Sequence, residues 1–283
     1  MLKARFMTRV LVALASASFL GCSSSSSSIS PDGGAGGSAG SGGSGGPEVS
    51  STDLQPDSPG NMSPDTGGPG DTAEAGGSGS CATAGYTLCD DFEGAAPGAA
   101  GSPWTFIMKG AYTIAVDATQ AHSGTHSIHA MATAAAGYAY IQETKTFPAT
   151  DFWVRAYLRL QALGGHEVYV GADTAMDEGT GDQVRYLNNM GGAKIATNRR
   201  AGDRAVTSAT AIPQGSWDCY EWHQTPDGVH VFFNGKAITD ADWLGAQPTF
   251  VALVFGIERF GGGMVGNIWI DDVAINSAQV GCN

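Results

Sequence analysis

Basic residues and long apolar runs are both scarce in this sequence. Lys and Arg number 14 against 27 Asp and Glu, which gives a formal net charge of −13. A chain this acidic has no basic surface for a polyphosphate backbone, so we expect no nucleic-acid partner and favour a neutral ligand or a bound cation. The apolar run 10–20 is too short to span a bilayer, which takes about 20 residues.

Aromatic and basic side chains are missing altogether from residues 23–80. This segment consists almost wholly of Gly, Ser, Pro, Asp, Thr and Ala. It holds too little apolar surface to offset the entropy lost on ordering, and we therefore expect a disordered linker. Residues 81–283 are then long enough for one globular domain with a single core, which we expect to be monomeric.

The first 22 residues have the pattern of an export signal. Lys3, Arg5 and Arg9 precede the apolar run, and Gly21-Cys22 follows it. The end of the run resembles a bacterial lipobox, with Phe19 in place of the usual Leu. That resemblance implies a signal peptide over 1–22 and lipidation of Cys22. Because residue 23 is Ser, it also implies a surface-exposed lipoprotein of the outer membrane that contacts the membrane through its lipid anchor only. Ordinary secretion with cleavage nearby is the alternative.

Four of the five cysteines fall in the predicted domain, namely Cys81, Cys89, Cys219 and Cys282. An even number in an oxidising compartment predicts two disulfides, with three possible pairings. If the terminal strands pair antiparallel, either Cys81 or Cys89 should meet Cys282. No CxxC pair exists, which argues against a zinc site.

Helical periodicity is absent from the domain, and runs rich in Val, Ile, Tyr, Phe and Trp recur between turns. Turn chemistry is clear at 225–228 (Thr-Pro-Asp-Gly) and at Asn234-Gly235. The pattern predicts an all-β, two-sheet antiparallel sandwich. The expected strands are 87–93, 104–109, 112–117, 127–132, 138–146, 152–161, 166–173, 183–189, 217–224, 229–234, 250–258 and 267–275.

One strand, 152–160, carries an unusual set of side chains. Its even positions are apolar and should face the core, while its odd positions place Trp153, Arg155, Tyr157 and Arg159 on the other face. Aromatic rings stack on sugars and Arg pairs with carboxylates, so this face is a candidate ligand platform. An arginine–aromatic ladder that only decorates the sheet is the alternative.

Further candidates lie on nearby strands. Glu221 and His223 share one face of strand 217–224 and could transfer protons, although a simple hydrogen-bonded pair is the commoner arrangement. We expect Glu258 and Arg259 to form an ion pair at a strand end. Additional residues that could line the same groove are His166, Glu167, Tyr169, Gln183, Arg185 and Asn189.

Three segments carry a family resemblance. Residues 89–94 (Cys-Asp-Asp-Phe-Glu-Gly), 122–127 (His-Ser-Gly-Thr-His-Ser) and 268–273 (Ile-Trp-Ile-Asp-Asp-Val) resemble signatures of concanavalin A-like jelly rolls. The stretch 87–282 is similar to the core domain of the fungal cellulose-induced secreted proteins, a fold shared with glucuronan lyases. The resemblance implies a curved sandwich whose concave face holds carbohydrate, and a structural calcium ion that ties the terminal strands together.

The resemblance also implies a ligand set for that ion. Glu93 and Asp271 would bind through their side chains, and Ser123 and His126 through their carbonyl groups, with Asp272 in reserve. Calcium prefers such a mixture of carboxylate and carbonyl oxygens. An Asp pair that only caps a strand end is the alternative.

Three functions remain open: a surface-anchored polysaccharide-binding module, a lyase acting on uronic-acid glycans, and a structural or adhesive envelope protein. A lyase must neutralise a uronate and supply a base. Arg155 or Arg185 could neutralise, with Gln183 or Asn189 assisting, and the base could be Tyr157, His166 or His223. The Glu-x-Asp-x-x-Glu signature of the related glucanases is missing from the sequence, so hydrolysis has the least support.

Overall fold

A computed structural model describes residues 81, 85–99, 101–144, 150–190, 192–202 and 204–282. The chain divides into two units, Met1–Pro64 and Asp65–Asn283, and every described residue belongs to the second. The predicted signal peptide, Cys22 and the whole of the predicted linker 23–80 lie outside the described residues, and so their predictions stay untested. Within the described ranges, no helix is both long enough and apolar enough to cross a bilayer.

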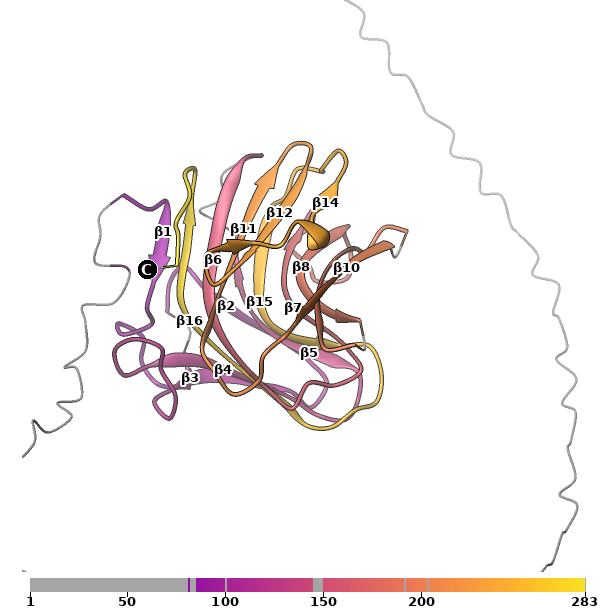
Figure 1. Cartoon of the computed structure of the whole chain (residues 1–283). Coiled ribbons are helices and arrows are strands. Elements are labelled where there is room, and N and C mark those ends of the chain that lie inside the picture. Colours follow the sequence, from indigo (N-terminus) through magenta and orange to yellow (C-terminus); the bar gives the residue numbers. More distant parts are fainter. Residues whose placement is uncertain are drawn as a thin grey trace, which may run out of the picture. The chain divides into compact units, whose positions relative to one another are not determined.

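The described part of the chain folds into two antiparallel sheets (Figure 1). The first runs in the order β13-β12-β11-β6-β16-β4-β3, with β1 added on β16 and β14 on β12, and the second runs β10-β9-β8-β7-β15-β5-β2. The strands of the first sheet are β1 (Leu88–Asp90), β3 (Thr113–Asp117), β4 (Ser127–Ala132), β6 (Phe152–Gln161), β11 (Asp218–Thr225), β12 (Gly228–Phe233), β13 (Lys236–Ala237), β14 (Trp243–Leu244) and β16 (Gly266–Asn276). Those of the second are β2 (Thr105–Lys109), β5 (Gly137–Glu143), β7 (His166–Asp173), β8 (Gln183–Met190), β9 (Lys194–Arg199), β10 (Arg204–Ala211) and β15 (Ala252–Arg259); a 3₁₀ turn, η2, covers Thr239–Ala241.

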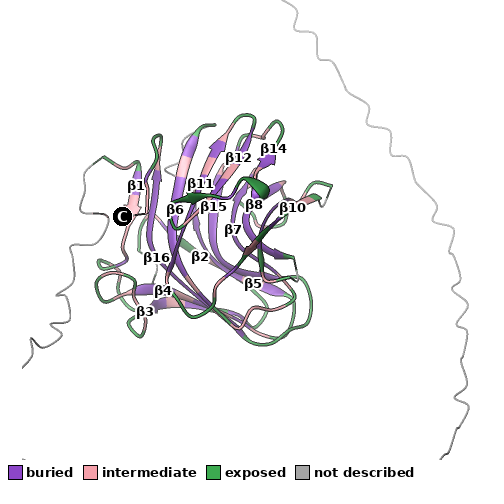
Figure 2. Cartoon of the chain, viewed as in Figure 1, coloured by how far each residue is buried: buried purple, intermediate pink, exposed green. Residues whose placement is uncertain are grey.

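The hydrophobic core lies between the two sheets. Alternation on β6 sends Val154, Ala156 and Leu158 into the core, as their even positions predicted, and β15 contributes Leu253 and Phe255 from the opposite sheet. Most residues of the central strands are accordingly buried, whereas most residues of the connecting loops are exposed or intermediate (Figure 2). The predicted all-β, two-sheet sandwich is confirmed.

Two strands of the second sheet, β9 and β10, were not expected from the sequence. Their residues, Lys-Ile-Ala-Thr-Asn-Arg and Arg-Ala-Val-Thr-Ser-Ala-Thr-Ala, contain no aromatic residue and few large apolar ones. They form nevertheless because β9 completes backbone pairing with β8, and β10 then pairs with β9. Backbone pairing with the neighbouring strand therefore stabilises β9 and β10, although the strand propensity of their own residues does not predict them.

The disulfides connect Cys81 to Cys89 and Cys219 to Cys282. The expectation that Cys282 would meet Cys81 or Cys89 is therefore wrong, although its premise holds, since β1 and β16 do pair antiparallel. The register explains the difference: Cys89 lies opposite Ala274, well before the C-terminal cysteine. Beyond β16 the chain instead reaches β11, where Cys219 bonds to Cys282.

Candidate functional site

The outer face of the second sheet carries a dense set of polar side chains. On β5, Ala139 and Ile141 point into the core, which leaves Tyr138, Tyr140 and Gln142 on the opposite face. The same alternation on the neighbouring strands adds further polar residues to that face. We call this surface the polar face and define it by Tyr138, Tyr140, Gln142, Asp173, Gln183, Arg185, Asn188, Asn198 and Glu258.

Much of the polar face is buried even though it lies outside the core, because the loop between β7 and β8 folds over it. The Gln142 side-chain amide donates to the Met176 carbonyl at 2.8 Å, and Gln183 donates to Glu178 at 3.2 Å. Arg200 forms an ion pair with the same Glu178 carboxylate. These contacts fix the loop against the polar face, and the loop forms one wall of the candidate binding site.

Next to this wall the face is hollow. A cavity of about 270 Å³ is lined by Lys109, Ala136, Gly137, Tyr138, Glu178, Gly179, Glu258, Arg259 and Phe260. Its lining combines aromatic rings with carboxylates and one ammonium group, which is the mixture expected where a polar ligand with flat apolar faces binds.

The floor of the cavity contains a carboxyl group suited to proton transfer near neutral pH. Glu258 accepts a hydrogen bond from the Tyr140 hydroxyl at 3.2 Å. Burial, followed by the nearby Glu178 charge, raises the pKa of Glu258 to about 7. Burial also holds the pKa of Tyr140 well above 10, so this tyrosine is a donor and not an anionic base in the structure.

A second buried carboxyl group lies along the same face. Asp173 accepts from the Gln183 amide at 3.0 Å. Burial and the Glu178 charge raise the pKa of Asp173 to about 8. Gln183 also links this acid to the cationic part of the face, because its carbonyl oxygen accepts from Arg185 at 3.0 Å.

The platform predicted on β6 lies on the other sheet, and its centre is covered. Arg155 is 1% exposed and Tyr157 is 8% exposed. The Arg155 guanidinium donates to the carbonyls of Asp272 and Gly281, and the Tyr157 ring stacks on His122 at 3.5 Å. The alternation was predicted correctly, but an open platform is wrong, because the C-terminal segment and the loop around His122 cover this part of the face.

The two ends of that row are more accessible. Trp153 stacks on His223 at 4.1 Å, and His223 is 2.8 Å from Asp151. Arg159 is half-buried, opposite Trp269 in the strand register. These residues are on the opposite side of the sandwich from the polar face, so Arg155 and Arg185 cannot serve one ligand.

Glu221 has a structural task at the same location. It is fully buried, and it accepts from the backbone amides of Val280 and Gly281 and from the side chain of Gln279. The carboxylate thus holds the C-terminal segment against β11. The expected hydrogen bond between Glu221 and His223 is not formed, because His223 bonds to Asp151 instead.

The remaining predicted residues divide between the core and the polar face. Tyr169 packs in the core and donates to Glu167 at 2.6 Å. Asn189 bonds to the loop residues Gly164 and Ala193. His166 lies at the rim of the polar face, where its ring contacts Phe260 at 4.8 Å.

Glu258 and Arg259 do not pair with each other, contrary to expectation. Neighbouring strand residues point to opposite faces, so Glu258 meets Tyr140 while Arg259 forms a buried ion pair with Glu167. Sequence reasoning also missed Tyr138, Tyr140 and Glu178 as parts of a site. Alternation in 138–142 was a usable signal for the two tyrosines, whereas nothing in the sequence marks Glu178, which is brought in by a loop.

This architecture has known counterparts. The family model described as Polysacc_lyase-like, the Cip1-like core domain, matches residues 91–278. The chain belongs to this family. A search of curated proteins found no match to this chain.

Two solved structures are similar to this Cip1-like domain. "Cellulose induced protein, Cip1" is 24% identical over 69% of this chain and 100% of its own, with a TM-score of 0.56. An endo-β-1,4-glucuronan lyase from the fungus Trichoderma reesei is 12% identical over 69% of this chain and 96% of its own, with a TM-score of 0.50. At these identities the likeness establishes the Cip1-like fold alone.

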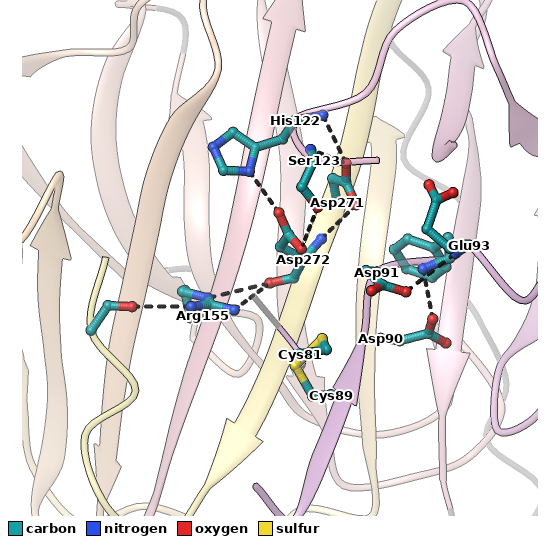
Figure 3. The surroundings of a disulfide bond; sticks show 12 residues. Cys81, Cys89, Asp90, Asp91, Glu93, His122, Ser123, Arg155, Asp271 and Asp272 are labelled. Atoms are coloured by element: carbon teal, nitrogen blue, oxygen red, sulfur yellow. Dashed lines mark hydrogen bonds and ion pairs between the residues drawn. A yellow bond between two sulfur atoms is a disulfide. The ribbon is translucent and has the colours of Figure 1, made fainter. Parts of the chain in front are cut away.

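The residues expected to bind calcium in this Cip1-like domain meet at one turn. Asp271 accepts from the backbone amides of His122 and Ser123 at 2.7 and 3.2 Å, and Glu93 accepts from that of His126 at 2.7 Å. Asp272 bonds to the side chains of His122 and Ser123 (Figure 3). Hydrogen bonds from backbone amides and from side chains, not carbonyl ligands, therefore connect the turn with the acids.

The donor chemistry of this region nevertheless fits calcium. Asp271 and Asp272 are both completely buried side by side, and the nearby Arg155 donates to the Asp272 carbonyl. Buried carboxylates call for a compensating cation, and oxygens are the ligands calcium prefers. Among the described residues, no three His, Cys, Asp or Glu side chains already form a metal-binding group. Binding would therefore need a local change at the turn.

Proposed function

We propose that this protein binds polysaccharide on the polar face of its second sheet. The observation that carries the proposal is the cavity between Tyr138, Glu258 and Phe260, where aromatic rings border a carboxyl floor. Sugars present apolar ring faces to aromatic side chains and hydroxyl groups to carboxylates and amides, so this lining matches their chemistry. Membership of a polysaccharide lyase-like family supports the same ligand class.

Affinity electrophoresis of the full chain through gels that contain glucuronan, alginate, cellulose derivatives or xylan tests this proposal. We expect retardation by at least one polysaccharide, and lost retardation in Tyr138→Ala. Migration of the wild-type chain that no polysaccharide changes would overturn the proposal and favour a structural or adhesive role instead.

A lyase is the second candidate, favoured by the position of Arg185 and Glu258 on one face. β-Elimination requires a cation to neutralise the uronate and a base to remove the adjacent proton. Arg185 could supply the first, and the carboxyl group of Glu258, with its pKa near 7, the second. Absorbance of unsaturated products on incubation with glucuronan, lost in Glu258→Gln but kept in Asp227→Asn on an exposed turn, would establish this activity.

We propose further that a structural calcium ion binds at the turn between Glu93 and Asp271. The carboxylates of Glu93, Asp271 and Asp272 would supply ligands, together with carbonyl oxygens of Ser123 and His126. The ion would fix the 122–126 turn against β1 and β16, without taking part in carbohydrate chemistry.

The location of the protein is also a proposal. Lipidation of Cys22 would anchor the domain to the outer membrane by a long linker and let it meet extracellular polysaccharide. Incorporation of labelled palmitate that is lost in Cys22→Ala supports the anchor, and equal labelling of both proteins contradicts it.

A further inference from the structure

Asn188 is a buried polar residue on the polar face that the sandwich itself does not use. It is completely buried, and neither its amide nitrogen nor its amide oxygen has a hydrogen-bond partner among the described residues. Buried amides without partners are disfavoured, and those that persist in a native structure call for an explanation. A ligand that supplies the missing partners is such an explanation.

Strand register places Asn188 in line with the open cavity. Tyr138 lies opposite Glu258, Glu258 opposite Val168, and Val168 opposite Asn188 on successive strands. Asn188 also lies opposite Ala196 on β9, two residues from Asn198, which bonds Arg185. The amide therefore belongs to the same face as Glu258 and Arg185.

Arg185 provides an unmatched charge close to this amide. Its guanidinium is 3% exposed and donates to Gln183 and Asn198, whose side chains are both neutral. No carboxylate of the described residues lies within ion-pair distance of it, and its charge only partly offsets the burial that raises the pKa of Glu258. A buried arginine bound only by neutral oxygens is complementary to an incoming carboxylate.

Phe260 connects the cavity with Arg185. It lines the cavity, and the Arg185 guanidinium lies over its ring, 4.7 Å from the ring centroid. The ring is 43% exposed, and three glycines follow it in the chain, Gly261, Gly262 and Gly263. A poorly enclosed ring next to a glycine-rich turn can move at little cost.

We propose that Phe260 is a gate, and that its displacement joins the cavity to a second subsite in which Arg185 and Asn188 bind the carboxylate and a neighbouring hydroxyl group of an acidic sugar. This inference rests on the proposed polysaccharide-binding function and specifies one subsite within it. Neutral sugars would use the outer cavity alone.

Calorimetric titration of the full chain tests the gate with two probes of equal length, a glucuronic acid oligosaccharide and a cellooligosaccharide. We expect Phe260→Ala to bind the acidic probe several-fold more tightly, because the gate no longer competes for Arg185. We expect Asn188→Leu to bind it at least tenfold more weakly while its melting temperature stays equal or rises, because an unpartnered amide has been removed. A purely structural residue would lose stability on substitution.

Two variants outside the subsite serve as controls. Leu244→Ala removes an exposed apolar side chain from the other sheet, and Thr197→Val removes another unpartnered buried polar group, on the opposite face of β9. Both should bind the acidic probe as the wild type does.

The outcomes separate this inference from the proposed function. Wild-type binding of the cellooligosaccharide alone, unchanged affinity of Asn188→Leu for the acidic probe, or weaker acidic-probe binding in Phe260→Ala overturns the gated subsite and leaves the polysaccharide-binding proposal standing. Failure of the wild-type chain to bind any glycan overturns both.

Discussion

At the scale of single residues, environment decides what a charged group does. Glu258 and Arg259 are adjacent, yet one joins Tyr140 on the polar face and the other pairs with Glu167 beside the core. Glu221, a proton-transfer candidate by its sequence context, is instead saturated by amides of the C-terminal segment. Residue type alone suggested an ion pair at the first position and proton transfer at the second. The partners supplied by distant parts of the chain determine what each side chain does.

The raised pKa of Glu258 predicts how stability depends on pH. Between pH 4.5 and pH 7 the unfolded chain has lost the proton that the folded chain still holds. The free energy of unfolding therefore falls as the pH rises through this window, by at most about 3 kcal/mol from this group. In Glu258→Gln the free energy of unfolding should fall less between these two pH values. Urea unfolding at pH 4.5 and pH 7 measures the difference, with Asp227→Asn as the matched control. A wild-type pH dependence in Glu258→Gln would refute the raised pKa of Glu258.

At the scale of elements, alternation on β6 assigned inner and outer residues correctly but could not show what covers the outer ones. Arg155 is buried because the segment after β16 crosses over it, bonded to Glu221 and tied to β11 by a disulfide. That crossing depends on contacts far apart in the sequence. For the same reason β9 and β10 escaped prediction, since neighbouring strands define them more than their own residues do.

The two disulfides should differ in their contribution to stability. Cys219–Cys282 closes a loop with a sequence separation of 63, whereas Cys81–Cys89 closes one of 8. Chain entropy then gives about 4 kcal/mol for the first and about 2.5 kcal/mol for the second. Thermal unfolding of the two double alanine variants should show the larger loss for Cys219/Cys282. An equal or reversed order would mean that the C-terminal segment is held mainly by Glu221 and Arg155.

At the scale of the whole molecule, the sequence was sufficient for the sandwich and for the family but not for the position of the candidate site. Strand propensity, turn residues and three short motifs led to the two-sheet fold. The site was expected on the sheet that contains β6, whereas the hollow polar face belongs to the sheet that contains β8. Sheet curvature and the folding of the 174–182 loop over one face are properties of the assembled molecule.

Calcium gives a prediction for the stability of the whole domain. If the ion binds only the folded state, a hundredfold excess over its dissociation constant adds about 2.7 kcal/mol to the free energy of unfolding. We expect EDTA to lower the melting temperature of the wild type, and calcium to restore it. Glu93→Gln should be insensitive to both. Equal melting temperatures of the wild type in EDTA and in calcium would contradict a structural ion.

The most direct test of the central claim compares one aromatic residue from each outer face. Tyr138 borders the cavity of the polar face, and Trp153 lies on the opposite face beside His223. Calorimetric titration of Tyr138→Ala and Trp153→Ala with the polysaccharide that retards the wild type most should show at least tenfold weaker binding for Tyr138→Ala and wild-type affinity for Trp153→Ala. The reverse result, with both variants still folded, would place the carbohydrate on the β6 face and contradict the account.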